Sequence, residues 1–300
     1  MQRYHEIHNN DTVALCALSS PAPPEMITYA AESLSAFGLH VAVCNSCFQT
    51  DGYLAGSDEL RARDFNNAVR DDCIAAIFAL RGGYGAQRIL PLIDWNACAA
   101  ARKAFVGYSD ATAIHGVLQT RCNLQSIHAP MPATELVYGL DAFTTNAYAS
   151  CLFAPGADIQ NPDGAPLTTL SSGAAEGELV GGNLSVIAAG LGTPYALQTQ
   201  GKILFLEDTD EEAYRIDRLL TQLAQAGLFH NCAGILLGQF TDCSPTAGIS
   251  ADMVLARTCS GMQKPVLAGL ACGHNLPTMT IRLGARLHMD ADTCLLRYTE

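Results

Sequence analysis

Residues 73–120 read CIAAIFALRGGYGAQRILPLIDWNACAAARKAFVGYSDATAIHGVLQT, and this stretch decides the fold because it repeats one pattern twice. In each copy a short apolar run is followed by a glycine-containing turn and then by apolar residues at helical spacing. The runs at residues 73–80 and 104–106 predict buried strands, and residues 86–93 and 111–120 predict helices. Strands that alternate with helices favour a parallel sheet covered on both faces.

The same alternation extends toward the N-terminus, where residues 12–18 and 41–43 predict strands and residues 26–37 and 59–69 predict helices. Ligands of such sheets bind at the carboxyl ends of the strands. The two most unusual turns, residues 81–85 and 107–110, both follow predicted strands. We therefore expect the functional site to include these two turns.

A change in composition marks a second domain. Residues 155–177 are rich in Pro, Gly, Ser and Asp and show no periodicity, which is typical of a linker. We predict an α/β domain over residues 1–155, a linker over 156–176 and a second domain over 177–300. Its predicted buried strands are 202–206 and 234–237, its predicted helix is 211–225, and its predicted antiparallel strands are 278–283, 286–289 and 294–298.

Composition limits the partners and the location. The chain has 300 residues, 49% of them hydrophobic, which suffices for a large core. A net charge of -12 with only 17 Lys and Arg argues against a nucleic-acid partner, because binding phosphates needs clustered basic groups. No apolar run reaches the length of about 18 residues that a membrane span needs, and the N-terminus lacks a signal-peptide pattern. We expect a cytoplasmic protein without a membrane partner.

The 12 cysteines are scattered through predicted strands and helices, which suits a reducing compartment. Cys44 and Cys47 form the one C-x-x-C pair, which is compatible with a redox pair or half of a zinc site. No second pair accompanies it. We therefore interpret these thiols as small apolar or surface residues.

Ser109 lies in the sequence AFVGYSDATAIHGVL, in a tight turn between an apolar strand and a helix. This pattern is close to the G-x-S-x-G nucleophile elbow, with Ala111 in place of the second glycine. The start of the following helix would offer free N–H groups to an oxyanion beside the serine. Helix capping explains a serine at this position equally well.

The turn Arg81-Gly82-Gly83-Tyr84-Gly85 directly follows a predicted strand. Its three glycines let the backbone approach a ligand or adopt positive φ, so the turn could hold an anion. It does not match a dinucleotide fingerprint or a phosphate loop, because the required glycine spacing and the lysine are absent. A merely tight strand-to-helix turn remains the alternative.

Two further segments supply acid and base groups. Glu207 and Asp208 follow the predicted strand 202–206, where a carboxylate could orient a histidine or cap the next helix. Asp208 is well placed for capping, which leaves Glu207 for chemistry. His274 lies in a predicted glycine-containing loop and is our preferred base, with His115 and His128 as rivals.

Taken together, these segments resemble the LD-carboxypeptidase family, which includes murein tetrapeptide carboxypeptidases and microcin-immunity peptidases. The resemblance spans nearly the whole chain. Its motifs are Ser19-Ser20-Pro21, Arg81-Gly82-Gly83-Tyr84-Gly85, Gly107-Tyr108-Ser109-Asp110, His128-Ala129-Pro130, Gly181-Gly182-Asn183-Leu184, Leu206-Glu207-Asp208 and Gly273-His274.

The resemblance implies a catalytic triad of Ser109, Glu207 and His274, with an oxyanion hole formed by the N–H groups of Gly83 and Asp110. It also implies a flavodoxin-like parallel-sheet N-terminal domain, a smaller β-rich C-terminal domain, a site in the cleft between them, and a homodimer. The implied chemistry is acyl transfer without a metal or cofactor. We further expect the side chains of Arg81 and Tyr84 to bind substrate.

The activity implied by the resemblance is removal of the terminal D-alanine from a cytoplasmic murein tetrapeptide during cell-wall recycling. Two alternatives are a microcin-immunity-type peptidase that cleaves peptidyl or aminoacyl adenylates, and a catalytically silent muropeptide-binding protein. The second of these is disfavoured because all three triad positions are filled. The sequence departs from the family pattern at Ala129, usually glycine, and at Arg282, usually proline.

Overall fold

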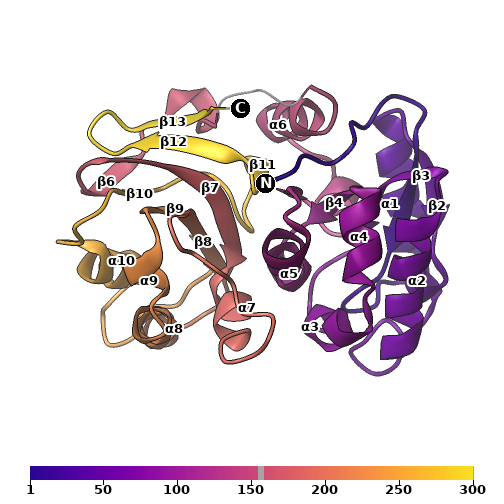
Figure 1. Ribbon diagram of the computed structural model, residues 1–300, viewed down its shortest axis with the longest axis horizontal. Helices are drawn as coiled ribbons and strands as arrows, with labels where there is room; N and C mark the ends of the chain where they lie inside the picture. The colour runs from indigo at the N-terminus through magenta and orange to yellow at the C-terminus, as the bar shows by residue number, and fades with distance from the viewer. Residues whose placement is uncertain (155–158, 300) are drawn as a thin grey trace.

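The computed structural model describes residues 1–154 and 159–299, and these form two lobes that are each built around one sheet (Figure 1). The first sheet has the strand order β11-β5-β4-β3-β1-β2, and the second has the order β13-β12-β7-β8-β9-β10-β6. The protein is therefore of the α/β class, with a parallel-sheet N-terminal lobe and a β-rich C-terminal lobe, as predicted.

The strands of the first lobe form the doubly wound sheet that the sequence pattern predicts. Neighbouring strands from β1 to β5 run parallel. Their order, 2-1-3-4-5, is that of flavodoxin-like sheets. Their bounds are β1 Thr12–Cys16, β2 His40–Val43, β3 Ile74–Ala79, β4 Ala104–Gly107 and β5 Ser126–His128.

Helices cover both faces of this sheet (Figure 1). Their bounds are α1 Pro24–Ala36, α2 Asp58–Arg70, α3 Ala86–Ile89, α4 Trp95–Ala101, α5 Thr112–Cys122 and α6 Ala142–Phe153. The helix predicted over residues 86–93 is shorter, because α3 ends before Pro91, which lacks the N–H that a continuing helix needs. Helices α4 and α6 were not predicted.

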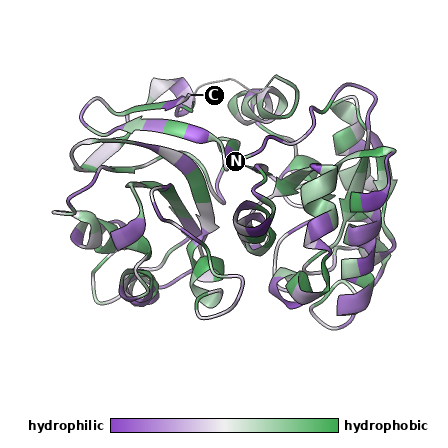
Figure 2. Cartoon of the chain, in the orientation of Figure 1, coloured by the Kyte–Doolittle hydropathy of each residue, from purple (hydrophilic) through white to green (hydrophobic). Residues whose placement is uncertain are grey.

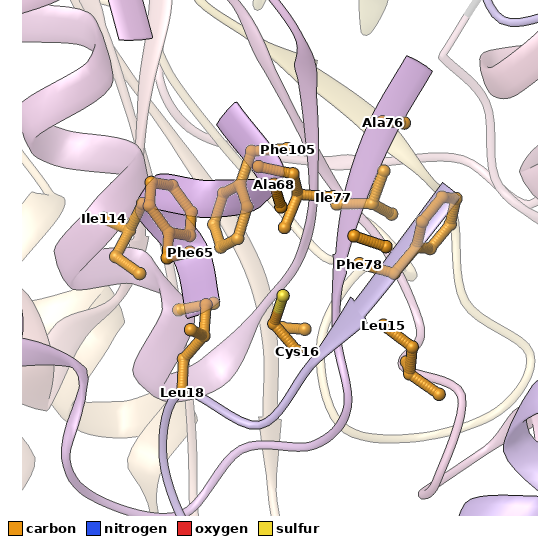
Figure 3. Packing of buried hydrophobic residues seen from close by; sticks show 14 of the residues in the cluster. Leu15, Cys16, Leu18, Phe65, Ala68, Ala76, Ile77, Phe78, Phe105 and Ile114 are labelled. Atoms are coloured by element: carbon orange, nitrogen blue, oxygen red, sulfur yellow. The ribbon is translucent and has the colours of Figure 1, made fainter. Parts of the chain in front are cut away.

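The core of the first lobe lies between the sheet and the helices that cover it, and Figure 3 shows a part of it that includes residues of α2 and α5. Phe65 of α2 and Phe105 of β4 meet edge to face with ring centroids 5.8 Å apart. Hydrophobic residues follow the strands inside the lobe, while hydrophilic ones gather on α2 at its outer side (Figure 2). This packing fixes the carboxyl ends of β1, β3 and β4, where the candidate site begins.

The second lobe is a mixed sheet. Strands β7, β8, β9 and β10 run parallel, and β6, β12 and β13 are antiparallel to their neighbours. The strand bounds are β6 Thr168–Ser171, β7 Ala174–Asn183, β8 Ile203–Thr209, β9 Gly234–Thr241, β10 Val266–Ala268, β12 Arg286–Asp290 and β13 Leu295–Tyr298. The helix bounds are α7 Leu184–Ala189, α8 Ala213–Gln225, α9 Leu228–Asn231 and α10 Ala251–Cys259.

One predicted strand of the tail joins the other lobe. Residues 278–283 were expected in the C-terminal antiparallel sheet, but β11, Ile281–Leu283, pairs antiparallel with β5 at the edge of the first sheet. All three residues of β11 are buried, so the strand covers an edge that would otherwise expose unpaired backbone groups. Periodicity shows that a strand forms and cannot show which edge it pairs with.

The segment predicted as a linker, residues 156–176, contains β6 and the start of β7. Pairing of β6 with β10 gives these residues regular structure despite their polar composition. The predicted boundary at residues 155 and 156 lies outside the described residues, so the domain limits stay a prediction. Within the described ranges, no helix is long and apolar enough to cross a membrane.

Candidate active site

Ser109 lies in a strained turn at the carboxyl end of β4. Its φ of 59° is a left-handed conformation that serine rarely adopts. Ser109 begins a 3₁₀ turn, Ser109–Ala111, which leads directly into α5. The strand, turn and helix therefore form the elbow that the sequence predicted, and they leave the Ser109 side chain half-buried rather than fully enclosed.

The buried carboxylate of Asp110 holds this turn against its neighbours. It accepts hydrogen bonds from Ser19 Oγ at 2.6 Å and from the backbone N–H of Ala86 at 2.8 Å. Burial raises the pKa of Asp110, and these two hydrogen bonds oppose that rise. The Asp110 side chain thus connects the turn to the ends of β1 and of the glycine-rich segment, while its backbone N–H remains our predicted oxyanion donor.

The glycine-rich turn lies against Ser109. A Cβ on Gly82 would lie 2.9 Å from Ser109 Oγ, so only glycine leaves room for the hydroxyl. Gly83 has a φ of 114°, and a Cβ there would lie 2.2 Å from Ser20 Oγ. The structure therefore places the predicted nucleophile and the predicted oxyanion turn side by side.

Glu207 and His274 form a hydrogen-bonded pair on the second lobe. Glu207, within β8, is fully buried, and His274 Nδ1 donates to its Oε2 at 2.7 Å. Only 14% of the His274 side chain is exposed. A Cβ on Gly273 would lie 3.3 Å from Glu207 Oε2, so the glycine lets the loop approach the carboxylate closely.

The environment of this pair favours a basic imidazole. Burial lowers the pKa of His274, but the hydrogen bond and charge of Glu207, aided by Glu135 and Asp208, outweigh it and raise the pKa above its usual value. Burial raises the pKa of Glu207, and the hydrogen bond from His274 opposes this. The pair can therefore take up a proton and stabilise it on the ring.

Tyr108 connects the two halves of the site. It precedes Ser109 in the chain, and its ring centroid lies 4.5 Å from that of His274. Among the residues that the structure describes, no hydrogen bond joins Ser109 Oγ to His274. Catalytic hydrogen bonds often form only when substrate binds, so the lack of this bond is compatible with a nucleophile and its base.

The two rival histidines are buried and differently engaged. His115 Nε2 donates to the Gly107 carbonyl at 2.8 Å, and Ser126 Oγ donates to Nδ1 at 2.8 Å. Burial lowers the pKa of His115 to about 4. Burial likewise lowers the pKa of His128 well below its usual value. Among the described residues, neither has a carboxylate partner such as the one that His274 has.

Asp208 caps a helix, but a different one from that expected. Instead of α8, it binds the start of α7, accepting from Ser185 N at 3.0 Å and Ser185 Oγ at 2.7 Å. It also accepts from Asn183 Nδ2 at 2.8 Å. The parallel pairing of β7 with β8 causes this, since it sets the two strand ends side by side.

The two predicted substrate-binding residues flank the glycines. Arg81 is half-buried, and its Nη1 donates to the Pro21 carbonyl at 3.3 Å. Tyr84 is 46% exposed, and its ring centroid lies 5.9 Å from that of Tyr53. Tyr84 is therefore accessible to a ligand, whereas Arg81 is partly engaged by the protein itself.

A groove of about 550 Å³ opens beside His274, over the carboxyl end of β9. Its polar lining includes Gln239, Asp242 and Asn275. Asn275 N donates to Gln239 Oε1 at 3.2 Å, which connects the His274 loop to β9. The groove offers room for a peptide next to the predicted base.

The two cysteines of the C-x-x-C pair, Cys44 and Cys47, contact different partners. Cys44 Sγ lies 3.1 Å from Cys16 Sγ, while Cys47 Sγ donates to the Leu15 carbonyl at 3.1 Å. Burial raises the pKa of Cys47 to about 12, so this thiol stays protonated. Over the described part of the chain, no group of three His, Cys, Asp or Glu side chains is arranged to hold a metal ion.

The two residues that depart from the family pattern, Ala129 and Arg282, lie outside the Glu207–His274 pair. Ala129 is buried, and its N–H donates to the Gly107 carbonyl at 3.2 Å. The Arg282 guanidinium lies 4.2 Å above the ring of Tyr298, on the side of β13. Sequence reasoning missed Glu135, whose carboxylate accepts from Tyr108, because nothing near Glu135 in the chain indicates this contact.

Comparison with known proteins shows what the chain is similar to. Family models described as the LD-carboxypeptidase N-terminal and C-terminal domains match residues 13–129 and 176–289. A probable murein peptide carboxypeptidase of Bacillus subtilis (strain 168) is 37% identical, over 95% of this chain and 90% of that protein. The microcin C7 self-immunity protein MccF of Escherichia coli is 27% identical, over 97% and 93%. The crystal structure of muramoyltetrapeptide carboxypeptidase from Oxalobacter formigenes superposes with a TM-score of 0.85 at 28% identity, over 95% of this chain and 97% of that one.

Proposed function

The chain belongs to the LD-carboxypeptidase family, and on this premise we propose that it is a serine-type carboxypeptidase that releases terminal D-alanine from murein tetrapeptides. The observation that carries this proposal is the buried hydrogen bond between Glu207 and His274. The His274 ring contacts the ring of Tyr108, which directly precedes the strained Ser109. The names of the murein peptide relatives support the substrate class. The predicted cytoplasmic location and homodimer belong to the same proposal.

In the proposed mechanism His274 takes the proton of Ser109 as the hydroxyl attacks the scissile carbonyl. Glu207 holds Nδ1, which leaves Nε2 to receive that proton, and its charge stabilises the imidazolium that results. His274 then protonates the leaving D-alanine nitrogen. A water molecule, deprotonated by the same ring, releases the acyl group from Ser109.

The N–H groups of Gly83 and Asp110 are proposed to bind the oxyanion. The positive φ of Ser109 and the close packing of Gly82 against its hydroxyl support this, because both bring the two turns together at the serine. Donors fixed before the reaction lose little free energy to reorganisation when the charge develops. Arg81 and Tyr84 are proposed to bind the substrate at the rim of this hole.

One observation favours the adenylate-cleaving alternative. The exposed rings of Tyr53 and Tyr84 form an aromatic pair beside Gly83, and such a pair could stack on a nucleobase. Trp95 does not serve this purpose, because its Nε1 donates to the Leu90 carbonyl at the start of α4. The similarity to the self-immunity protein makes this the second candidate.

Three substrates distinguish the candidates. Purified protein is incubated with a murein tetrapeptide, with the corresponding pentapeptide, and with an aminoacyl sulfamoyl adenosine, and the released amino acid is measured. We expect D-alanine from the tetrapeptide only, because the fixed oxyanion donors accept one face of the carbonyl. Equal release from the pentapeptide would contradict the L,D assignment, and cleavage of the adenosine compound alone would favour the second candidate. Binding without turnover would indicate a silent module.

A further inference from the structure

The ring of a tyrosine packs against the ring of the predicted catalytic base. The Tyr108 ring lies 4.5 Å from the His274 ring at an interplanar angle of 49°. Glu207 fixes His274 at Nδ1, within the plane of the imidazole, at 2.7 Å. The imidazole is therefore restrained at Nδ1 by the hydrogen bond to Glu207 and on another side by the tilted ring of Tyr108.

A carboxylate outside the proposed triad holds this tyrosine. Tyr108 Oη donates to Glu135 Oε1 at 2.6 Å. Glu135 Oε2 accepts from Met131 N at 2.9 Å and from Thr134 Oγ1 at 2.5 Å. Burial, followed by the charge of Glu135, raises the pKa of Tyr108, so the phenol keeps the proton that it donates. Three donors thus fix Glu135, and Glu135 fixes Tyr108.

The other side of Tyr108 leads back to the strand that carries Glu207. The ring of His128 lies 5.5 Å from that of Tyr108, and the ring of Phe205 lies 5.2 Å from that of His128. Phe205 and Glu207 both belong to β8. Through the rings of His128 and Phe205, Tyr108 is therefore connected to β8, the strand whose Glu207 orients His274.

We propose that Tyr108 and Glu135 are positioning residues for the catalytic base: Tyr108 sets the orientation of the His274 ring, and the Glu135 carboxylate holds Tyr108 in place behind it. This inference rests on the proposed function, since it assigns a task to residues that act only through His274.

The charged and titratable groups that face His274 come from several elements. They are Glu207 and Asp208 of β8, Glu135 before the 3₁₀ turn Leu136–Tyr138, Tyr108 after β4, and His128 of β5. His128 stays neutral, because burial lowers its pKa. The remaining carboxylates oppose the effect of burial on His274 and raise its pKa, so removing one charge lowers that pKa.

Two substitutions separate charge from geometry. Glu135→Gln removes the charge and can keep the contacts, since its amide nitrogen can donate to the Tyr108 oxygen. We expect the pKa of His274 to fall, and the acid limb of kcat/KM to move to lower pH with it. Tyr108→Phe keeps the ring but loses the bond to Glu135, and we expect kcat to fall by about tenfold while KM changes little.

A matched control and a rescue variant accompany them. Tyr148 is fully buried, and its ring packs against Phe37 at 5.1 Å; within the described part of the chain its hydroxyl forms no hydrogen bond, neither to Glu135 nor to His274. Tyr148→Phe therefore removes a buried tyrosine hydroxyl and should leave both the pH profile and kcat unchanged. Glu135→Asp keeps the charge and should restore the wild-type acid limb, which a purely structural role of this residue would not require.

The deciding experiment is an NMR titration of His274 in the Ser109→Ala background, with and without Glu135→Gln, alongside pH profiles of the active variants. A lower His274 pKa in the Glu135→Gln protein supports the inference, and an unchanged pKa overturns it. The titration needs no turnover, so it can succeed when the wild-type protein releases no D-alanine, an outcome that contradicts the proposed function instead. If Glu135→Gln fails to fold, an unchanged kcat in folded Tyr108→Phe overturns the positioning role.

Discussion

The carboxyl edges of the two sheets contribute to the candidate site in different ways. At the first edge, the ends of β3 and β4 bring tight turns together, and the contribution is largely backbone: the strained Ser109 and the glycines at 82 and 83. At the second edge, β8 and a distant loop bring together two side chains, Glu207 and His274, which lie 67 residues apart in the chain. In the proposed mechanism, the first edge supplies the nucleophile and binds the reacting carbonyl, and the second edge accepts and returns the proton.

The contrast between backbone turns at the first edge and a side-chain pair at the second indicates which parts of a site can be recognised from sequence. A turn forms from neighbouring residues, so its glycines and its position after an apolar run can be recognised directly. A hydrogen-bonded pair depends on which strands become neighbours and on how a loop folds back. Substitutions at the two edges should therefore fail in different ways, and the following predictions run from the largest expected loss to the smallest.

His274→Ala at the second edge should lower kcat/KM by about 10⁴-fold or more, because the proton of Ser109 then has no acceptor. Adding Ser109→Ala should cost little more, since residues that act as a unit are not additive. Steady-state kinetics on the single and double variants tests this. A larger loss of kcat in folded His115→Asn or His128→Asn would show that the wrong base was chosen.

Glu207→Gln keeps the size of the side chain but removes the charge that stabilises the imidazolium. We expect kcat to fall by about 10²- to 10⁴-fold, with KM nearly unchanged. Glu176→Gln is the control, because Glu176 forms an exposed ion pair with Arg286, away from the site. A wild-type rate for Glu207→Gln would remove the second edge from the mechanism.

Gly83→Ala tests the first edge. The new Cβ would meet Ser20 Oγ, and alanine tolerates the φ of 114° poorly, so we expect a cost of about 1–3 kcal/mol in stability. The displaced N–H should also lower kcat by about 10- to 100-fold. Gly139, with a φ of 81° and open space around it, is the control. Thermal unfolding and kcat together separate the two effects, since Gly139→Ala should lose stability only.

The pH dependence of kcat/KM should be set by Glu207 and His274 at the second edge, and not by the turns at the first. His274 must be neutral to accept a proton, so kcat/KM should rise with pH until the pKa of His274 is passed, by about tenfold per pH unit on the acid limb. Because the carboxylates raise that pKa, the limb should lie at higher pH than for an ordinary histidine. Glu207→Gln should move it to lower pH. An acid limb that Glu207→Gln leaves in place would contradict the assigned base.

Much of the fold follows from local pattern, and the exceptions have a common cause. The apolar runs at residues 12–18, 73–80 and 104–106 predicted β1, β3 and β4, because a fully buried parallel strand needs little besides apolar side chains. The partner of β11, the thiol that Cys44 meets and the helix that Asp208 caps were not predictable. Each depends on which distant segments become neighbours.

The site residues also divide into those that local sequence predicts and those that depend on distant neighbours. The turns around Ser109 and Gly83 were predicted from their own residues, whereas the choice of His274 over His115 and His128 stayed open until the resemblance to a family was considered. Glu135 carried no recognisable signal, since nothing near it in the chain indicates that Tyr108 would reach its carboxylate. Side-chain pairs between segments that are distant in the chain need the fold before they can be recognised.

The most direct test of the account is the initial rate of D-alanine release from a murein tetrapeptide by the wild-type protein and by Ser109→Ala, measured side by side with circular dichroism and substrate binding. The account predicts steady release by the wild-type protein. For Ser109→Ala it predicts a loss of about 10⁴-fold or more, with fold and binding retained, because only the nucleophile is removed. Release by Ser109→Ala at a rate near that of the wild type would contradict the account.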